Sequence, residues 1–523
     1  MSETAVTKHL TADFIASLNT LLAQLDLNDA KEKELKQLLT QKEGTINSLG
    51  EKSDQASSVI GLIVQICEIV FGENFIREAG AIQQQVAKSW TQTCHLPAAG
   101  IITPQSSKDV SKTLRILTTG HVPFAIRSGG HCPNPGFSSV DGSGILIDLS
   151  ALSQVSISED KKIASVGPGA DWGKVVDFLD EHDVTVLGAR SPQIGVGGLL
   201  LGGGISHFTP EYGFACDMLV KAEVVLADGS VITASHTEHT DLFRALKGGG
   251  PNFGIVSRFY LSTVPIKNIW YESNAYAPDQ AHAILDAFAK FQEQDDPKAA
   301  LIISLRTQVG IVAFVYSAPE EKPKAFDMFY DIPVLAPGVP ATLGTVKQLS
   351  AITGALSATP PARHDYRAAS SKLDAGLYRE VYDFWLAKAT PICAETGAEA
   401  TFVPQHIPKS IVERSKKNGG NAMGLEEIDQ HWWTSIMTWN DPAHDDLVRG
   451  IGIETTQKWE ELSKARGSHL PFLYMNDASR DQNPLATYSN ESLEKLKEVA
   501  KKYDPEGVFQ KLQQGGFLLS KVP

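Results

Sequence analysis

A short stretch of glycine, serine and histidine could present a reactive side chain to a phosphate-bearing ligand. The stretch RSGGHCPNPG occupies residues 127–136 and places His131 directly after three small residues. Small residues let a backbone come close to a ligand, and successive free N–H groups form a concave site for anions. His131 would then face whatever the loop holds, and could either react with it or pack against it.

Two further glycine clusters follow, GVGGLLLGGG (195–204) and KGGGPNFG (247–254). Tight turns between short strands would explain any one cluster, but glycine costs conformational entropy, so three clusters need a shared reason. The nucleotide loop GxxxxGK[ST] is absent, and Leu200 stands where a dinucleotide fingerprint needs its third glycine. A dinucleotide held by several loops, without a single fingerprint, stays open.

The elements that must position these loops change along the chain. The pattern predicts helices at 11–25, 29–44 and 57–72, the last one buried. From about 95 to 265, it predicts short strands and small helices with glycine at nearly every turn, which is typical of an α+β domain. The strands are expected at 144–150, 162–170 and 253–265, a hairpin at 222–235 turning at Asp228-Gly229, and the first helix at 106–119.

Residues 266–470 favour longer strands with covering helices. Strands are expected at 269–277, 300–318 and 431–440, helices at 279–294, 367–389 and 445–465, and loops around 332–345 and 357–362. In a strand at 431–440, one face would carry Trp433, Ser435, Met437 and Trp439 and the other Trp432, Thr434 and Ile436. Either face is a candidate pocket wall, and packing on helices is the alternative. The tail is expected to be a helix stopped at Asp504-Pro505.

Composition narrows the class of protein. The chain has 523 residues, which predicts two or three domains. Its net charge of −14 argues against nucleic acid or an anionic membrane as the main partner. Five dispersed cysteines without a CxxC pair fit a reducing compartment and exclude a zinc ribbon. With no signal-peptide pattern and no apolar run of about twenty residues, a cytoplasmic protein is expected.

Eight motifs in order resemble the FAD-linked oxidoreductases of the berberine bridge enzyme-like group, within the vanillyl-alcohol oxidase/PCMH superfamily, and most closely its fungal branch. They are PFAIRSGGH, GILIDLSAL, VGPGADWGKV, GVGGLLLGGG, YGFACDMLV, VVLADGSVITAS, DLFRALKGGGPNFGIV and YDPEGVFQKLQQGGF. The resemblance implies an α+β fold: a two-subdomain PCMH-type FAD-binding domain plus an antiparallel-sheet substrate domain covered by helices, with a helical N-terminal extension. The expected boundaries are 1–90 for the extension, 91–266 for the FAD domain, 267–473 for the substrate domain, and 474–523 for a segment returning to the FAD domain.

The resemblance implies FAD as the cofactor, wrapped by the glycine loops, and no metal. His131 would bond covalently to the flavin 8α-methyl group, the alternative being a loop histidine that only hydrogen-bonds. Ser191 in SPQIG stands where some members have a cysteine for a second link, and serine cannot supply a thiolate, so one link is expected. Ile194 falls where the family controls access of O2. The cofactor-binding residues expected are Arg127, Ser128, Gly129, Gly130, His131, Ser191, Ile194, Gly195, Val196, Gly197, Gly198, Gly202, Gly254, Ile255, Val256 and Asn476.

On the substrate side, the run YMNDAS places Asp477 where the family often has a tyrosine base. A carboxylate there could take a hydroxyl proton as a hydride leaves to flavin, provided that burial raises its pKa. The alternative is a loop aspartate that caps a turn. Tyr474 and Asn476 would line the flavin. His207 follows the second glycine cluster and could reach the site, although a lone histidine is more often structural.

Three functions follow as hypotheses. The first is an oxidase that takes a hydride from a small organic alcohol, amine or activated C–H group of secondary metabolism and passes electrons to O2, giving H2O2. The second is a cyclase or pericyclase-like enzyme on the same fold, in which FAD is structural or only primes the reaction and the pocket acts by positioning. The third, a non-enzymatic binding module using the N-terminal helices, is disfavoured by the intact flavin motifs.

Overall fold

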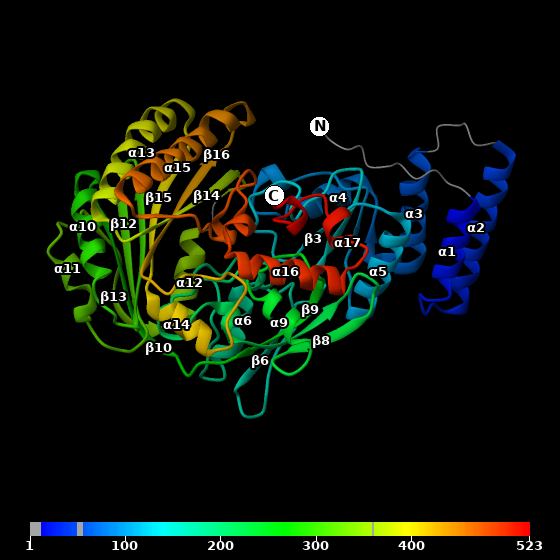
Figure 1. Cartoon of the computed structure of the whole chain (residues 1–523), viewed down its shortest axis with the longest axis horizontal. Coiled ribbons are helices and arrows are strands. Elements are labelled where there is room, and N and C mark those ends of the chain that lie inside the picture. The colour runs from blue at the N-terminus through cyan, green and yellow to red at the C-terminus, as the bar shows by residue number, and fades with distance from the viewer. Residues whose placement is uncertain (1–11, 50–55, 358–359) are drawn as a thin grey trace.

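The computed structural model describes residues 12–49, 56–357 and 360–523. Three N-terminal helices lie at one end of an elongated molecule, and a large sheet covered by helices lies at the other (Figure 1). Two smaller sheets and the glycine loops fill the middle. The C-terminal segment returns to this middle region, where Phe124 and Gln513 form an isolated parallel bridge.

A four-stranded sheet carries the loop 127–136. Its order is β1-β2-β4-β3, with β2, β4 and β3 parallel and β1 antiparallel to β2. The strands are β1 (Phe75–Ile76), β2 (Gly100–Ile102), β3 (Phe124–Arg127) and β4 (Ile145–Asp148). Strand β4 is buried along its whole length, as expected for an inner parallel strand. The loop begins directly after Arg127, so its position is fixed by the end of a buried sheet.

The second sheet has five antiparallel strands in the order β5-β6-β9-β7-β8. The strands are β5 (Val155–Ile157), β6 (Ile163–Val166), β7 (Leu219–Val225), β8 (Val231–Ser235) and β9 (Ile255–Ser262). Strands β7 and β8 form the hairpin expected from the sequence, with Gly229 in its turn at a φ of 80°.

The third sheet has eight antiparallel strands in the order β13-β10-β12-β11-β15-β16-β14-β17. They are β10 (Asn268–Tyr276), β11 (Ala299–Arg306), β12 (Gly310–Tyr316), β13 (Ala336–Thr345), β14 (Arg363–Lys372), β15 (Glu399–Ile407), β16 (Gln430–Trp439) and β17 (His469–Leu470). Helices α10 (Ala281–Phe291), α13 (Ala375–Thr396) and α15 (Asp445–Arg466) cover one face (Figure 1). The α+β fold with an antiparallel, helix-covered sheet is thereby confirmed.

The two faces of β16 serve different purposes. Trp433 packs with Trp459 and Phe402 in the aromatic core under the covering helices. Trp432 instead stacks on Tyr474 and on Phe214, which belong to segments outside the eight-stranded sheet. The face of Trp432, Thr434 and Ile436 therefore looks toward the glycine loops, and the Trp433 face is structural.

The N-terminal helices α1 (Ala12–Leu22), α2 (Asp29–Leu49) and α3 (Ala56–Phe71) form a bundle that joins the core around α5 (Ser107–Gly120). Helix α2 runs through Gly44 to Leu49, so the predicted end at Gly44 is wrong. One glycine costs a helix only about 1 kcal/mol, less than continuing the helix can gain. The predicted start of the first helix at residue 11 lies outside the described residues.

Two other predictions in the substrate half are wrong. Residues 367–372, expected to open a helix, are the second half of β14, and the helix α13 starts at Ala375 after its N-cap Asp374. Residues 336–345, expected to be a loop because of Pro337, Gly338 and Pro340, form the edge strand β13. Proline is tolerated at a sheet edge because the missing N–H would face solvent.

The remaining helices are α4 (Ala79–Val86), α6 (Trp172–Asp180), α7 (Val196–Leu201), α8 (Thr209–Tyr212), α9 (Thr240–Leu246), α11 (Asp327–Tyr330), α12 (Val346–Ser357), α14 (Lys409–Lys417), α16 (Asn490–Tyr503) and α17 (Val508–Lys511). None of the helices in the described part of the chain is both long and apolar enough to cross a membrane. Within the same residues, no group of three or more His, Cys, Asp or Glu side chains could hold a metal ion.

Candidate active site

The first two glycine loops are pinned to each other. A Cβ placed on Gly129 would lie 2.3 Å from Gly195 Cα, and one on Gly195 would lie 2.3 Å from Gly129 N. Ser128 Oγ donates to Pro168 O at 2.5 Å and accepts from Gly197 N at 3.1 Å. Part of the glycine requirement thus comes from contact between loops, a reason the sequence pattern did not reveal.

The same loops fit the diphosphate of a dinucleotide. Among residues 12–49, 56–357 and 360–523, no hydrogen bond from the amide of Gly129 or Gly130 is recorded, and Gly130 has a φ of 70°. Free N–H groups beside a left-handed residue form an anion-binding nest. Gly198 is exposed, and a Cβ there would touch nothing within 4 Å, so space remains beside the loops.

Arg127 fixes the strand end from which the loop starts. Its Nη2 lies 2.7 Å from Asp148 Oδ2 in an ion pair that is almost fully buried, and its Nη1 donates to Gln85 O at 2.9 Å. Burial alone would raise the pKa of Asp148, but the Arg127 charge and the hydrogen bond from Gln85 outweigh it and the pKa is lowered. The predicted cofactor residue Arg127 is thus committed to the protein scaffold.

His131 lies in a stack of three rings. Its ring is parallel to that of Trp90 at a centroid distance of 4.2 Å, and His364 stacks on the other face of Trp90 at 3.7 Å. Burial lowers the pKa of His131 to about 4. The imidazole is therefore neutral at physiological pH and keeps a nitrogen lone pair, which a bond-forming histidine needs.

Asp477 is half-buried where the C-terminal segment meets the eight-stranded sheet. Gln405 of β15 donates from Nε2 to Asp477 Oδ2 at 2.9 Å, and Arg190 Nη2 donates to Gln405 Oε1 at 2.8 Å. Burial raises the pKa of Asp477, while Arg190 and Gln405 act in the opposite direction without cancelling it. The raised pKa that Asp477 needs in order to act as a base is therefore present.

The charge of this carboxyl group acts on two buried tyrosines. Burial, and then the Asp477 charge, raise the pKa of both Tyr366 and Tyr474. Tyr474 Oη accepts from Gly204 N at 2.9 Å and from Asn476 Nδ2 at 3.0 Å. Both phenols remain protonated at neutral pH, so they can donate hydrogen bonds but are poor bases. Tyr474 and Asn476 also anchor the second glycine cluster, because a Cβ on Gly202 would lie 1.9 Å from Asn476 Oδ1.

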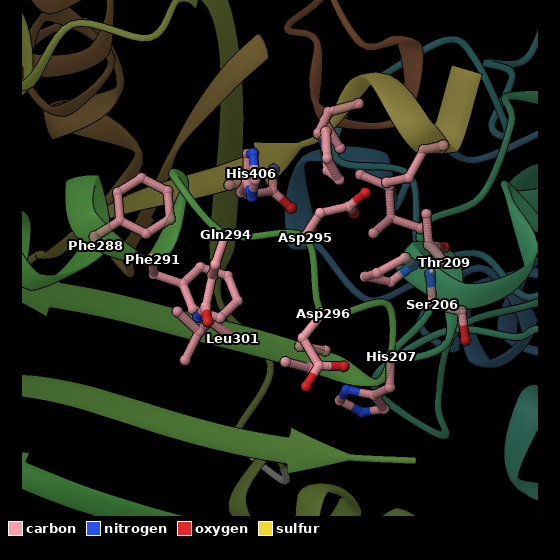
Figure 2. A pocket seen from close by; sticks show the side chains of 18 of the residues that line it. Ser206, His207, Thr209, Phe288, Phe291, Gln294, Asp295, Asp296, Leu301 and His406 are labelled. Carbon is pink, nitrogen blue, oxygen red and sulfur yellow. Dashed lines mark hydrogen bonds between the residues drawn. The ribbon is translucent and has the colours of Figure 1, made fainter. Parts of the chain in front are cut away.

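A narrow pocket of about 60 Å³ adjoins this cluster. It lies at the split between β11 and β15, which pair only at Leu305 with Phe402 and at Arg306 with Thr401. Figure 2 shows that Ser206 and His207 border it together with Asp295 and Asp296, and Arg190 and Gln405 also line it. Burial and the Arg190 charge lower the pKa of His207 to about 3, so this histidine is neutral. His207 borders the pocket together with Arg190, and its predicted role in the active site stays a prediction.

The other predicted cofactor residues lie at the edges of this region. Ser191 Oγ donates to Gln193 Oε1 at 2.6 Å, and Ile194 precedes the Gly195 loop, accepting a hydrogen bond from Trp172 N. Gly254 precedes β9, where Ile255 and Val256 are buried opposite β7. Val196, Gly197 and Gly198 form the first turn of α7. Their cofactor roles remain predictions.

Sequence reasoning missed Trp90, Arg190, Tyr366 and Gln405. None of them belongs to a glycine cluster or to the YMNDAS run. Tyr366 and Gln405 sit on β14 and β15, so an alternating-face reading of those strands would have pointed to them. No local sequence signal marks Trp90 or Arg190, because their contacts are with residues distant in the chain.

Comparison with known proteins agrees with this geometry. A family model described as an FAD binding domain matches residues 98–235. An FAD-dependent monooxygenase of Arthrobotrys oligospora is 37% identical over 83% of this chain and 84% of its own. The chain belongs to the berberine bridge enzyme-like FAD-linked oxidoreductases. An FAD-dependent monooxygenase of Penicillium terrestre (32% identical, 91% of this chain and 93% of its own) and the bifunctional solanapyrone synthase of Alternaria solani (33%, 84% and 85%) are further relatives of this oxidoreductase.

Solved structures show the same fold for this FAD-linked oxidoreductase. A berberine bridge enzyme-like protein of Physcomitrella patens superposes with a TM-score of 0.72 at 17% identity, covering 87% of this chain and 99% of its own. Glucooligosaccharide oxidase of Acremonium strictum superposes with a TM-score of 0.72 at 19% identity, covering 86% and 98%. The oxidoreductase binds FAD, and its N-terminal helices precede the conserved layout.

Proposed function

We propose that this oxidoreductase removes a hydride from the carbon of a small organic alcohol while Asp477 takes the hydroxyl proton, giving a carbonyl product. The observation that carries the proposal is the Asp477 carboxyl, which accepts a hydrogen bond from Gln405 at the junction of loops and sheet and has a pKa raised by burial. FAD, when bound by the glycine loops, supplies the two-electron acceptor. Relatives such as solanapyrone synthase support a substrate from secondary metabolism.

Asp477 and the two tyrosines have different roles in proton transfer. Oδ2 of Asp477 accepts from Gln405, so Oδ1 is the oxygen left to receive the proton. A raised pKa brings a carboxyl group closer to neutral pH and makes it a stronger base when ionised. Tyr366 and Tyr474, whose phenols keep their protons, can donate hydrogen bonds to the substrate oxygen but cannot replace the base.

The test is Asp477→Asn, which preserves shape and removes the base. The alcohol used in the test is found by screening benzylic and allylic alcohols for one that bleaches the flavin absorbance anaerobically. We expect flavin reduction by that alcohol to fall by about 10²–10⁴ in the variant, with FAD content unchanged. Reduction within threefold of the wild-type rate would contradict Asp477 as base. Substrate conversion while the flavin stays oxidised would support the cyclase alternative instead.

We further propose that FAD is bonded once to the protein, through His131. The neutral imidazole of His131 is available for bonding, and the structure of glucooligosaccharide oxidase, described as containing a 6-S-cysteinyl, 8α-N1-histidyl FAD, supports a histidyl link in this fold. Ser191 removes the second link. After acid precipitation, yellow colour should stay with wild-type protein and pass to the supernatant for His131→Ala. Colour released from the wild type would rule the link out.

O2 is proposed as the electron acceptor, giving H2O2. Several relatives carry the name monooxygenase, which makes insertion of an oxygen atom the competing outcome. Turnover under ¹⁸O2 separates the two. Stoichiometric H2O2 with no ¹⁸O in the organic product supports the oxidase, and label in the product shows the monooxygenase.

A further inference from the structure

Arg190 differs from the other buried or half-buried arginines near the site. Arg127 and Arg367 each pair directly with a carboxylate, at 2.7 Å in both cases. Arg190 has no carboxylate within 4.0 Å in the part of the chain that the structure describes, and its recorded hydrogen bond goes to the side chain of Gln405. An unpaired, half-buried cation is costly, so its place beside Asp477 calls for a reason.

The amide of Gln405 joins the two charges in one orientation only. A guanidinium group can only donate, so the Gln405 atom facing Arg190 must be the oxygen. The amide nitrogen then faces Asp477 and donates to Oδ2. If the amide were turned over, Arg190 would face an N–H group and both bonds would be lost. Arg190 therefore fixes the orientation of Gln405, and Gln405 fixes which oxygen of Asp477 is occupied.

We propose that Arg190 and Gln405 are positioning residues for Asp477, forming an ion pair separated by one amide that directs the substrate proton to Oδ1. This inference rests on Asp477 being the base of the proposed function. A direct Arg190–Asp477 pair would stabilise the charged carboxylate more strongly and make it a weaker base, whereas removal of the cation would favour the protonated form, which cannot accept a proton. The amide spacer keeps the attraction at an intermediate strength.

The surroundings of Asp477 are consistent with the positioning role of Arg190 and Gln405. The titratable groups coupled to its charge are Arg190 from the loop before α7, Tyr366 from β14, and Tyr474 from its own segment. Both tyrosines are neutral, so Arg190 is the cation that balances the carboxylate. His207 faces Arg190 and is neutral as well, so it does not compete for the carboxylate.

Infrared titration of the holoenzyme tests the inference without any substrate. The carbonyl band of protonated Asp477, assigned by its loss in Asp477→Asn, should appear at a midpoint at least one pH unit higher in Arg190→Met. Gln405→Glu should shift it upward too, because a second carboxylate would stand beside Asp477. Arg190→Lys should fall between the wild type and Arg190→Met. Arg258→Met, which removes an arginine bonded to Ser165 and Gln154, should leave the midpoint unchanged.

An Arg190→Met midpoint equal to that of the wild type would overturn the inference. So would an equal shift in Arg258→Met, because the effect would then be one of net charge. The rate of anaerobic flavin reduction by the screened alcohol should fall about tenfold for each pH unit below the midpoint. The pH at which this fall begins should shift together with the infrared midpoint. If the infrared midpoint shifts but the pH dependence of flavin reduction does not, Arg190 and Gln405 still position Asp477, and the proposal that Asp477 is the base fails.

Discussion

Arg127 and Asp148 show how single residues stabilise the cofactor loop. Both side chains are almost fully buried, and the two atoms Nη2 and Oδ2 lie 2.7 Å apart. Removing one partner leaves an uncompensated buried charge, so Asp148→Ala should lower the free energy of unfolding by about 3–5 kcal/mol. Urea titration at pH 7 measures it. Glu399→Ala, which breaks an exposed pair with Arg306, should change little, and equal losses would contradict the argument.

The same pair has a defined pH dependence. The pKa of Asp148 is lower in the folded protein than in the unfolded chain, where it is near 3.8. Its contribution to stability is therefore complete above pH 4 and is lost as the pH falls through the folded pKa. The difference between wild type and Asp148→Ala should be constant from pH 5 to 8 and shrink only in stronger acid.

Helices and strands hold the segment that follows Asp477 in place through a set of ion pairs. Arg367 of β14 contacts both carboxylate oxygens of Asp481 at 2.7 and 2.8 Å, and Arg449 of α15 bonds to Asp365 at 3.2 Å and Asp481 at 3.1 Å. Asp365 also accepts from Ser479 Oγ at 3.0 Å. These contacts tie the segment just after Asp477 to the eight-stranded sheet.

Arg367→Met should therefore slow flavin reduction by about tenfold or more, because small misplacements of a reacting group are costly. FAD content, read as the ratio of flavin to protein absorbance, should stay the same, since the glycine loops are untouched. Arg367→Lys should recover part of the rate. A loss of rate in step with a loss of FAD would show instead that the pairs support the whole fold.

Element prediction from sequence succeeded where periodicity was local. The hairpin at Asp228-Gly229 and the helix after Ser106 have their signals within a few residues, and Ser106 caps the helix as its position predicts. β14 failed because most of its residues are buried whichever face of the sheet they lie on, which removes the alternation of a half-exposed strand. β13 failed because its prolines suit a sheet edge as well as a loop.

At the scale of the whole molecule, motif order predicted the fold and the cofactor, but not the contacts around Asp477. The glycine loops act through backbone, and glycine is visible in a sequence. The Arg190–Gln405 and Gln405–Asp477 contacts join residues 215 and 72 positions apart. Such partners are set by how the sheet packs against the loops, which no local pattern encodes.

The molecule also buries several histidines in the neutral state. Burial lowers the pKa of His131, His364 and His406 to about 4, and that of His207 to about 3. An unfolded histidine titrates near 6.5, so below that pH the unfolded chain binds protons that the folded chain does not. Stability should fall from pH 6.5 toward pH 4. Asp217, Asp365, Asp477 and Asp504, whose pKa values burial raises, take up protons when folded and offset part of the loss.

His406→Asn isolates one histidine from this sum, because His406 Nε2 has no hydrogen-bond partner among the residues that the structure describes. Between pH 7.5 and pH 5, the free energy of unfolding should fall by about 2 kcal/mol more in the wild type than in the variant. The reason is that the pKa of His406 is about 4 in the folded protein and about 6.5 in the unfolded chain. Urea unfolding at the two pH values measures the difference. His282→Asn, at a half-exposed histidine beside Asp383, is the control. Equal pH dependence in wild type and His406→Asn would mean that His406 takes up its proton without unfolding.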